Sequence, residues 1–283
     1  MSTSSALIRD LPQPKPAATD EFGRRRRIDL WMLAGVAIAV IATVAGIAST
    51  GIDLAYFFQP TGALIVLGGT LGVTLITTPH TNLIHTTRRV IELFRNPVLS
   101  REQLIDEMVS YIRIVRTKGL YALEPALGKA SSRFLGDCLL LALDVKQRSE
   151  LQTALETKLR LTERQGEMDA KVLEVAGGFA PTIGVMGTVV GLIDVLRQFT
   201  ALNSVATGVG TAFVSTIYGL ALANLVLLPA AHRIRARVAE TFEIQELMIE
   251  GTLCLFDGVH PAIVRQRLSC FVRSQEPNES QLS

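Results

Sequence analysis

Four apolar stretches alternate with polar segments along the chain. They cover residues 30–48, 60–78, 175–196 and 208–231, and the only charged residue among them is Asp194, near the end of the third. A helix rises about 1.5 Å per residue, so each stretch is long enough to cross a hydrocarbon core of ~30 Å. The pattern therefore predicts four membrane-spanning helices.

The polar segments also carry a helical pattern. Leu104, Met108, Ile112 and Val115 recur at three- or four-residue steps, with a break expected near Gly119. Helical spacing returns over residues 234–256, and nothing in either segment resembles the alternation of a strand. The predicted fold class is all-α: a polytopic membrane protein with four transmembrane helices and a cytoplasmic helical domain.

Lysine and arginine set the expected orientation. The N-terminal tail holds six of them, the segment 80–173 fifteen and the tail after Ala231 six, whereas the connections 49–59 and 198–207 hold none. Because positively charged segments stay in the cytoplasm, both termini and the middle segment are predicted to be cytoplasmic. A cleaved signal is the alternative for the first stretch, but its length and the nearby second stretch favour a retained helix.

The expected organisation follows from these patterns. It consists of a disordered cytoplasmic arm (1–27), transmembrane helices 1 and 2 (28–79), a cytoplasmic helical domain (80–173), transmembrane helices 3 and 4 (174–231) and a cytoplasmic helical tail (232–283).

Composition narrows the function classes. Hydrophobic residues make up 48% of the chain and charged residues 19%, which favours a membrane protein. The three cysteines and four histidines lack the spacing of metal ligands, so neither a metal site nor a cofactor is predicted. No Ser/His/Asp set or carboxylate pair indicates catalysis, so no enzyme is expected. Few aromatics and no basic patch among them argue against nucleic-acid binding.

An ion path usually requires an ionisable group inside the bilayer, and the four stretches have none at depth. If the chain conducts ions, a partner must supply the central carboxylate, or hydroxyls and carbonyls must suffice.

The third and fourth stretches carry a polar face. Thr188 is ~20 Å above the cytoplasmic start of one helix, and Thr216 is ~10 Å below the outer start of the other, so the two lie at one level. Ser215 is adjacent to Thr216. Three glycines share the face of Thr188: Gly184, Gly187 and Gly191. The spacing by itself favours the packing of helices through small residues, and the alternative is a coordinating belt for an ion.

Two further pairs stand out. Pro181 and Pro229 lie near the cytoplasmic ends of the third and fourth stretches, where they indicate either paired hinges or ordinary helix ends. Arg116 and Glu124 flank Gly119, where opposite charges could steer a charged partner or simply form a solvated surface.

Several long motifs carry a family resemblance. The motifs at 57–79, 177–196, 209–234 and 250–268 read FFQPTGALIVLGGTLGVTLITTP, GGFAPTIGVMGTVVGLIDVL, VGTAFVSTIYGLALANLVLLPAAHRI and EGTLCLFDGVHPAIVRQRL. Their order and topology resemble the flagellar motor stator A-subunit (MotA/PomA type) of the MotA/TolQ/ExbB proton channel family, over about residues 28–272.

The resemblance implies a location in the bacterial inner membrane, a function and partners. The chain would conduct protons or sodium beside a single-span stator B-subunit (MotB/PomB type) that supplies the membrane aspartate, and five A-subunits would surround two B-subunits. A rotor switch protein would meet Arg116 and Glu124, Pro181 and Pro229 would be the coupling prolines, and Thr188 with Thr216 would face the aspartate. A threonine at position 188 resembles the sodium-type members of the family, but whether the ion is a proton or sodium stays open. The alternatives are a TolQ/ExbB-type energy-transducing subunit, which has three spans and an outward N-terminus, and a non-conducting membrane scaffold.

Overall fold

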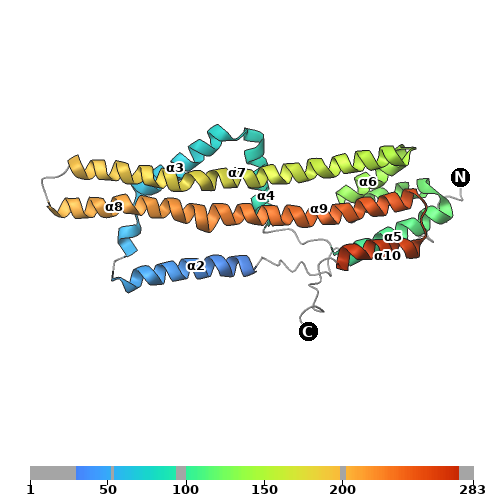
Figure 1. Ribbon diagram of the computed structural model, residues 1–283, viewed down its shortest axis with the longest axis horizontal. Coiled ribbons are helices and arrows are strands. Elements are labelled where there is room, and N and C mark those ends of the chain that lie inside the picture. Colours follow the sequence, from blue (N-terminus) through green and yellow to red (C-terminus); the bar gives the residue numbers. More distant parts are fainter. Residues whose placement is uncertain (1–29, 52–53, 94–99, 198–201, 274–283) are drawn as a thin grey trace. The chain divides into compact units, whose positions relative to one another are not determined.

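The computed structural model describes residues 30–51, 54–93, 100–197 and 202–273, and these residues contain helices and short connections but no strand (Figure 1). The predicted all-α class is therefore confirmed for this part of the chain. The helices run in the order α2 (Leu30–Ser49), η1 (Leu54–Phe57), α3 (Pro60–Thr77), α4 (His80–Leu93), α5 (Arg101–Lys118), η2 (Leu120–Lys129), α6 (Arg133–Asp144), α7 (Arg148–Arg197), α8 (Leu202–Ala221), the π-helical segment η3 (Leu222–Leu227), α9 (Leu228–Phe256) and α10 (Pro261–Arg273).

Three helical regions are long and apolar enough to cross a membrane: Ala55–Thr77, Arg148–Arg197 and Ala212–Phe256. They overlap the second, third and fourth apolar stretches. The first stretch falls in α2, whose apolar part within the described residues is the shorter Ala37–Ser49. The count of four spans and the division into membrane and cytoplasmic segments stay predictions. The arm 1–27 lies outside the described residues.

The helices form two compact units. Within the described residues, the first unit (100–159 and 242–273) contains α5, η2, α6 and α10, and the second unit (30–93 and 160–241) contains α2, α3, α4 and α8. The long helices α7 and α9 contribute to both units.

The periodic apolar residues build the core of the first unit. Leu104, Met108 and Ile112 are at most 1% exposed and pack with Leu247, Leu255 and Leu268 of α9 and α10. Helix α5 ends at Lys118 because Gly119 adopts a positive φ of 84°, which glycine tolerates without a steric penalty. The break expected near Gly119 is thus confirmed.

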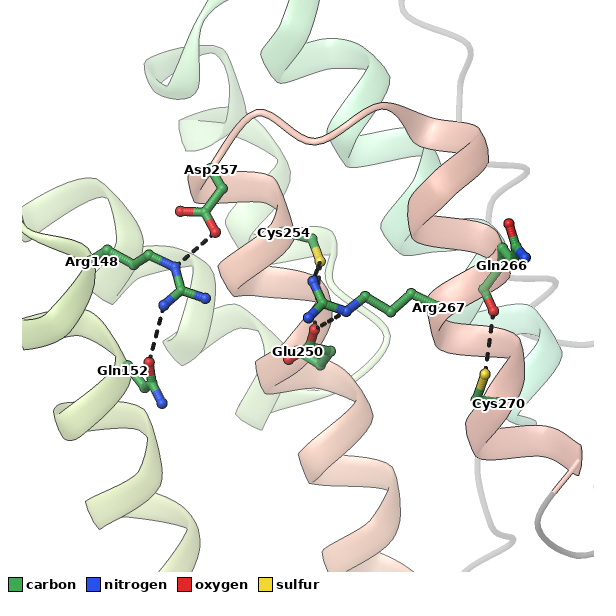
Figure 2. A network of polar contacts seen from close by, with 8 residues as sticks. All are labelled: Arg148, Gln152, Glu250, Cys254, Asp257, Gln266, Arg267 and Cys270. Atoms are coloured by element: carbon green, nitrogen blue, oxygen red, sulfur yellow. Dashed lines mark hydrogen bonds and ion pairs between the residues drawn. The ribbon is translucent and has the colours of Figure 1, made fainter.

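Polar contacts join α7, α9 and α10 in the first unit, as Figure 2 shows. Arg148 of α7 donates from Nε to Asp257 over 2.8 Å, and Arg267 of α10 pairs with Glu250 of α9 over 2.8 Å. Arg267 also donates to the Sγ of Cys254. Burial raises the pKa of the Cys254 thiol, so this sulfur is held as a neutral thiol in the contact.

Candidate functional site

Helices α7 and α8 pack closely because glycines line their contact. A Cβ on Gly219 would lie 2.5 Å from the carbonyl oxygen of Ala180, and one on Gly184 would lie 3.0 Å from that of Ser215. A Cβ on Gly191 would lie 2.9 Å from the Cβ of Ala212. Backbones that approach this closely leave no room for a side chain, as at other small-residue contacts between membrane helices. The predicted glycine face is therefore an intrachain packing surface.

Two threonine hydroxyls meet within that contact. The Oγ1 atoms of Thr188 and Thr216 are hydrogen-bonded to each other, and the Oγ1 of Thr188 also lies 3.1 Å from the carbonyl oxygen of Ala212 and 3.2 Å from that of Gly184. A hydroxyl has one proton, so Thr188 donates to one neighbour at a time and keeps a lone pair for another. Both threonines are half-buried, which leaves part of each accessible from outside the pair. The structure thus brings together the two residues that helical rise places at one level.

Ser215 lies deeper than its neighbour. Its side chain is 3% exposed, and its Oγ would be 2.5 Å from a Cβ on Gly62 of α3 and 3.2 Å from one on Gly187 of α7. Three helices therefore enclose this hydroxyl, and the missing side chains of Gly62 and Gly187 make the space for it. Ser215 belongs to the interior of the chain, whereas Thr188 and Thr216 reach its border.

A tyrosine that the sequence analysis did not single out joins the same assembly. The Tyr218 hydroxyl accepts a hydrogen bond of 3.0 Å from the backbone N–H of Gln59 and donates one to the carbonyl oxygen of Phe57. It fixes the start of α3, where Pro60 occupies the first turn, against α8. The sequence signal for this contact is the phenol hydroxyl of Tyr218 in a stretch without charges, because a buried tyrosine hydroxyl needs a hydrogen-bond partner.

The two prolines lie where α7 and α9 come into contact. Pro181 is inside α7, and Gly177, one turn before it, contacts Leu228, the neighbour of Pro229. A Cβ on Gly177 would lie 2.8 Å from a terminal carbon of Leu228. Proline disrupts the hydrogen bonding of the preceding turn, and the π-helical segment η3 precedes Pro229, so both helices are irregular at this level.

A buried carboxylate lies on α7 before the apolar stretch. Asp169 is 1% exposed and its Oδ1 lies 3.5 Å from the Thr86 hydroxyl of α4 and 3.3 Å from the Gln165 amide. Its Oδ2 is 3.6 Å from the Nε of Arg89 and has no hydrogen-bond partner among the described residues. Burial raises the pKa of Asp169, although Gln165, Arg89, His85 and Thr86 act in the opposite direction. Sequence periodicity gives no sign of this contact between α4 and α7.

The charged pair expected to meet a rotor belongs to the first unit. Arg116 is exposed in the last turn of α5, and Glu124 is exposed on η2. Neither forms an ion pair with another described residue. Leu123, beside Glu124, is fully buried and anchors η2 in the core. Across the described ranges, no group of three His, Cys, Asp or Glu side chains could hold a metal ion.

Comparisons with known proteins point in one direction. The family model of the MotA/TolQ/ExbB proton channel family matches residues 127–246, and the model of the motility protein A N-terminal region matches residues 33–119. Motility protein A of Bacillus subtilis is 26% identical over 88% of this chain and 93% of its own length, and the chemotaxis protein PomA of Vibrio alginolyticus is 26% identical over 86% and 93%.

Solved structures agree with the sequence comparisons. A chain of the flagellar MotAB stator complex from B. subtilis superposes with a TM-score of 0.78 at 26% identity, over 88% of this chain and 97% of that one. A chain of C. jejuni MotAB gives a TM-score of 0.81 at 22% identity, over 90% and 100%. The second likeness concerns the fold alone.

Proposed function

Because the chain belongs to the MotA-type stator subunits of the bacterial flagellar motor, we propose that its third and fourth spans form the wall of an ion path whose titrating carboxylate comes from a MotB-type partner. The chain is an ion-conducting stator subunit, and its family is one of channel subunits rather than enzymes. Its apolar helices make it a multi-pass protein of the inner membrane.

The arrangement proposed for the complex follows the charge pattern and the family resemblance. The chain crosses the membrane four times with both termini in the cytoplasm, and five copies surround two single-span B-subunits. The cytoplasmic charges Arg116 and Glu124 meet a rotor switch protein. Two observations support this contact with the rotor. Both side chains are exposed, and the buried Leu123 holds η2 in place beside Glu124.

One observation carries the ion-path proposal. Thr188 and Thr216 are half-buried hydroxyls that touch each other between two apolar helices, and no Lys, Arg, Asp or Glu lies between residues 175 and 193 or between 208 and 231. Two neutral hydroxyls can coordinate a cation or orient a proton carrier, but they supply no negative charge. A carboxylate from outside the chain completes the site, because an unpaired cation in the membrane is costly.

The proposed mechanism links neutralisation to movement. An ion enters between the two subunits, neutralises the partner aspartate and changes its contact with the Thr188–Thr216 pair. The helices then bend at Pro181 and Pro229, and the A-subunits rotate stepwise around the B-subunits. One charge crossing 100 mV releases ~2.3 kcal/mol, which matches one modest rearrangement of a helix contact.

Flux measurements in liposomes test the proposal. The chain alone should carry neither protons nor sodium above background, whereas the complex with its B-subunit should carry one of them selectively. Thr188→Val removes the hydroxyl and keeps the side-chain shape, so it should reduce flux or alter the ion preference. Thr182→Val is the matched control, because the exposed Thr182 hydroxyl bonds only to the Phe179 carbonyl of its own helix.

Two outcomes would contradict the proposal. Selective flux through the lone chain would show that no outside carboxylate is needed. Equal flux and ion preference in Thr188→Val and Thr182→Val would leave the threonine pair as a packing contact. Motility measured against sodium concentration then distinguishes the two ions.

A further inference from the structure

A single arginine joins α9 to two carboxylates of α7. Arg235 donates from Nη2 to one carboxylate oxygen of Glu174 over 3.0 Å and from Nη1 to the other. Its Nε lies 3.2 Å from the Oε2 of Glu167. Glu167 and Glu174 are seven residues apart, which places them on the same side of α7 two turns from each other. The guanidinium therefore spans two turns of the neighbouring helix.

The geometry distinguishes this contact from an ordinary surface ion pair. An exposed pair contributes at most about 1 kcal/mol to stability, because water screens it and flexible side chains must be ordered. Here the fork of Arg235 matches both oxygens of Glu174 and still has a donor for a second acid, an arrangement that a lysine ammonium does not reproduce. The three side chains are 29–45% exposed, so they are partly shielded by the helices.

The contact between Arg235 and the two acids lies close to the prolines of both helices. Glu174 precedes Pro181 by seven residues and Arg235 follows Pro229 by six, so each lies ~10 Å along its helix from the proline. Near the prolines, Gly177 packs on Leu228, and on the far side of the ion pairs Gly166 packs against Val238. The helices are thus joined by close contacts on both sides of Arg235.

We propose that Arg235, Glu174 and Glu167 form a clasp that makes α7 and α9 move as one body on the cytoplasmic side of the two prolines. Arg235 is a positioning residue in this arrangement. Movement of the spans at Pro181 and Pro229 passes through the clasp to the helices that follow, instead of being lost as sliding between them. This inference rests on the proposed function, since it assigns a route for the motion that ion flow produces.

The test separates torque from ion conduction. Full-length variants are expressed with the B-subunit in cells that lack their own stators, and stator assembly, ion flux and stall torque are measured. Arg235→Ala and the milder Arg235→Lys should assemble and conduct as the wild type does, while stall torque falls by about twofold or more. The exchange Arg235→Glu with Glu174→Arg should restore part of the torque, because the pair between these two positions forms again with its charges reversed while Glu167 is left facing a second carboxylate.

Lys171→Ala provides the matched control. Lys171 is exposed on α7 between the two acids, so its removal takes a charge from the same segment without touching the clasp. Unchanged torque in both Arg235 variants, or a loss of flux in proportion to torque, would overturn the inference, as would an exchange variant no better than Arg235→Glu alone. Absence of flux and torque in the wild-type complex would instead overturn the proposed function.

Discussion

Replacing Gly219 by alanine adds a single methyl group at the closest point between α7 and α8. The new Cβ would lie 2.5 Å from the Ala180 carbonyl oxygen and 3.0 Å from the Cα of Gly184. Both neighbours are backbone atoms, so no rotamer change relieves the contact. The two helices have to part by roughly 1 Å before the contact becomes ordinary.

The cost follows from overpacking. Inserting a methyl group into a well-packed contact costs typically about 1–3 kcal/mol, while alanine recovers up to ~1 kcal/mol of helix propensity. We therefore expect a net destabilisation of about 1–2 kcal/mol, which corresponds to a Tm lower by roughly 2–8 °C. The parting also pulls Thr188 away from Thr216, so flux through the complex should fall with stability.

Thermal unfolding of the purified protein in detergent measures the effect, with Gly178→Ala as the control. Gly178 lies on α7 with nothing within 4 Å of the position of a Cβ, so alanine there should leave Tm unchanged or raise it slightly. If Gly219→Ala and Gly178→Ala unfold at the same temperature, the close contact between the helix backbones is not the constraint that the structure indicates.

Three further outcomes are expected. Tyr218→Phe leaves the Gln59 N–H without its acceptor and should lower the unfolding free energy by about 1–2 kcal/mol in denaturant titrations, and no change would mean that water replaces the hydroxyl. Because burial raises the pKa of Asp169 above its unfolded value, its contribution to stability is present at low pH and lost as pH rises through the raised pKa. Asp169→Asn should therefore flatten the dependence of Tm on pH without lowering Tm at neutral pH, and a lower Tm there would mean that the ion pair outweighs the desolvation. Leu123→Ala should cost about 2–5 kcal/mol because it opens a cavity under η2, a loss that proteolysis within η2 would report.

Local sequence patterns predicted those features of the structure that depend on a single helix. The steps from Leu104 to Ile112 predicted a buried face, and counting helical rise placed Thr188 and Thr216 at one level, because periodicity and rise are properties of the chain itself. Gly219 was within reach of the same reasoning, since it follows Ser215 by four residues on the face that packs against α7.

Contacts between distant helices were not predictable in this way. Arg235 and Glu174 are 61 residues apart, and Asp169 meets Thr86 across 83 residues. Each of these side chains is an ordinary polar residue in its own helix. Only the relative rotation and offset of the helices decide which of them meet, and a single sequence does not contain that information locally.

The π-helical segment Leu222–Leu227 inserts one residue into the continuous helix formed by α8 and α9. A π turn holds one residue more than an α turn, so its return to α geometry would rotate everything after it by about 100° relative to everything before it. The extra residue therefore sets the phase of α9 relative to α8, so that Thr216 and Arg235 both face α7. The insertion lets one continuous helix keep its contacts with α7 on both sides of the irregular turn.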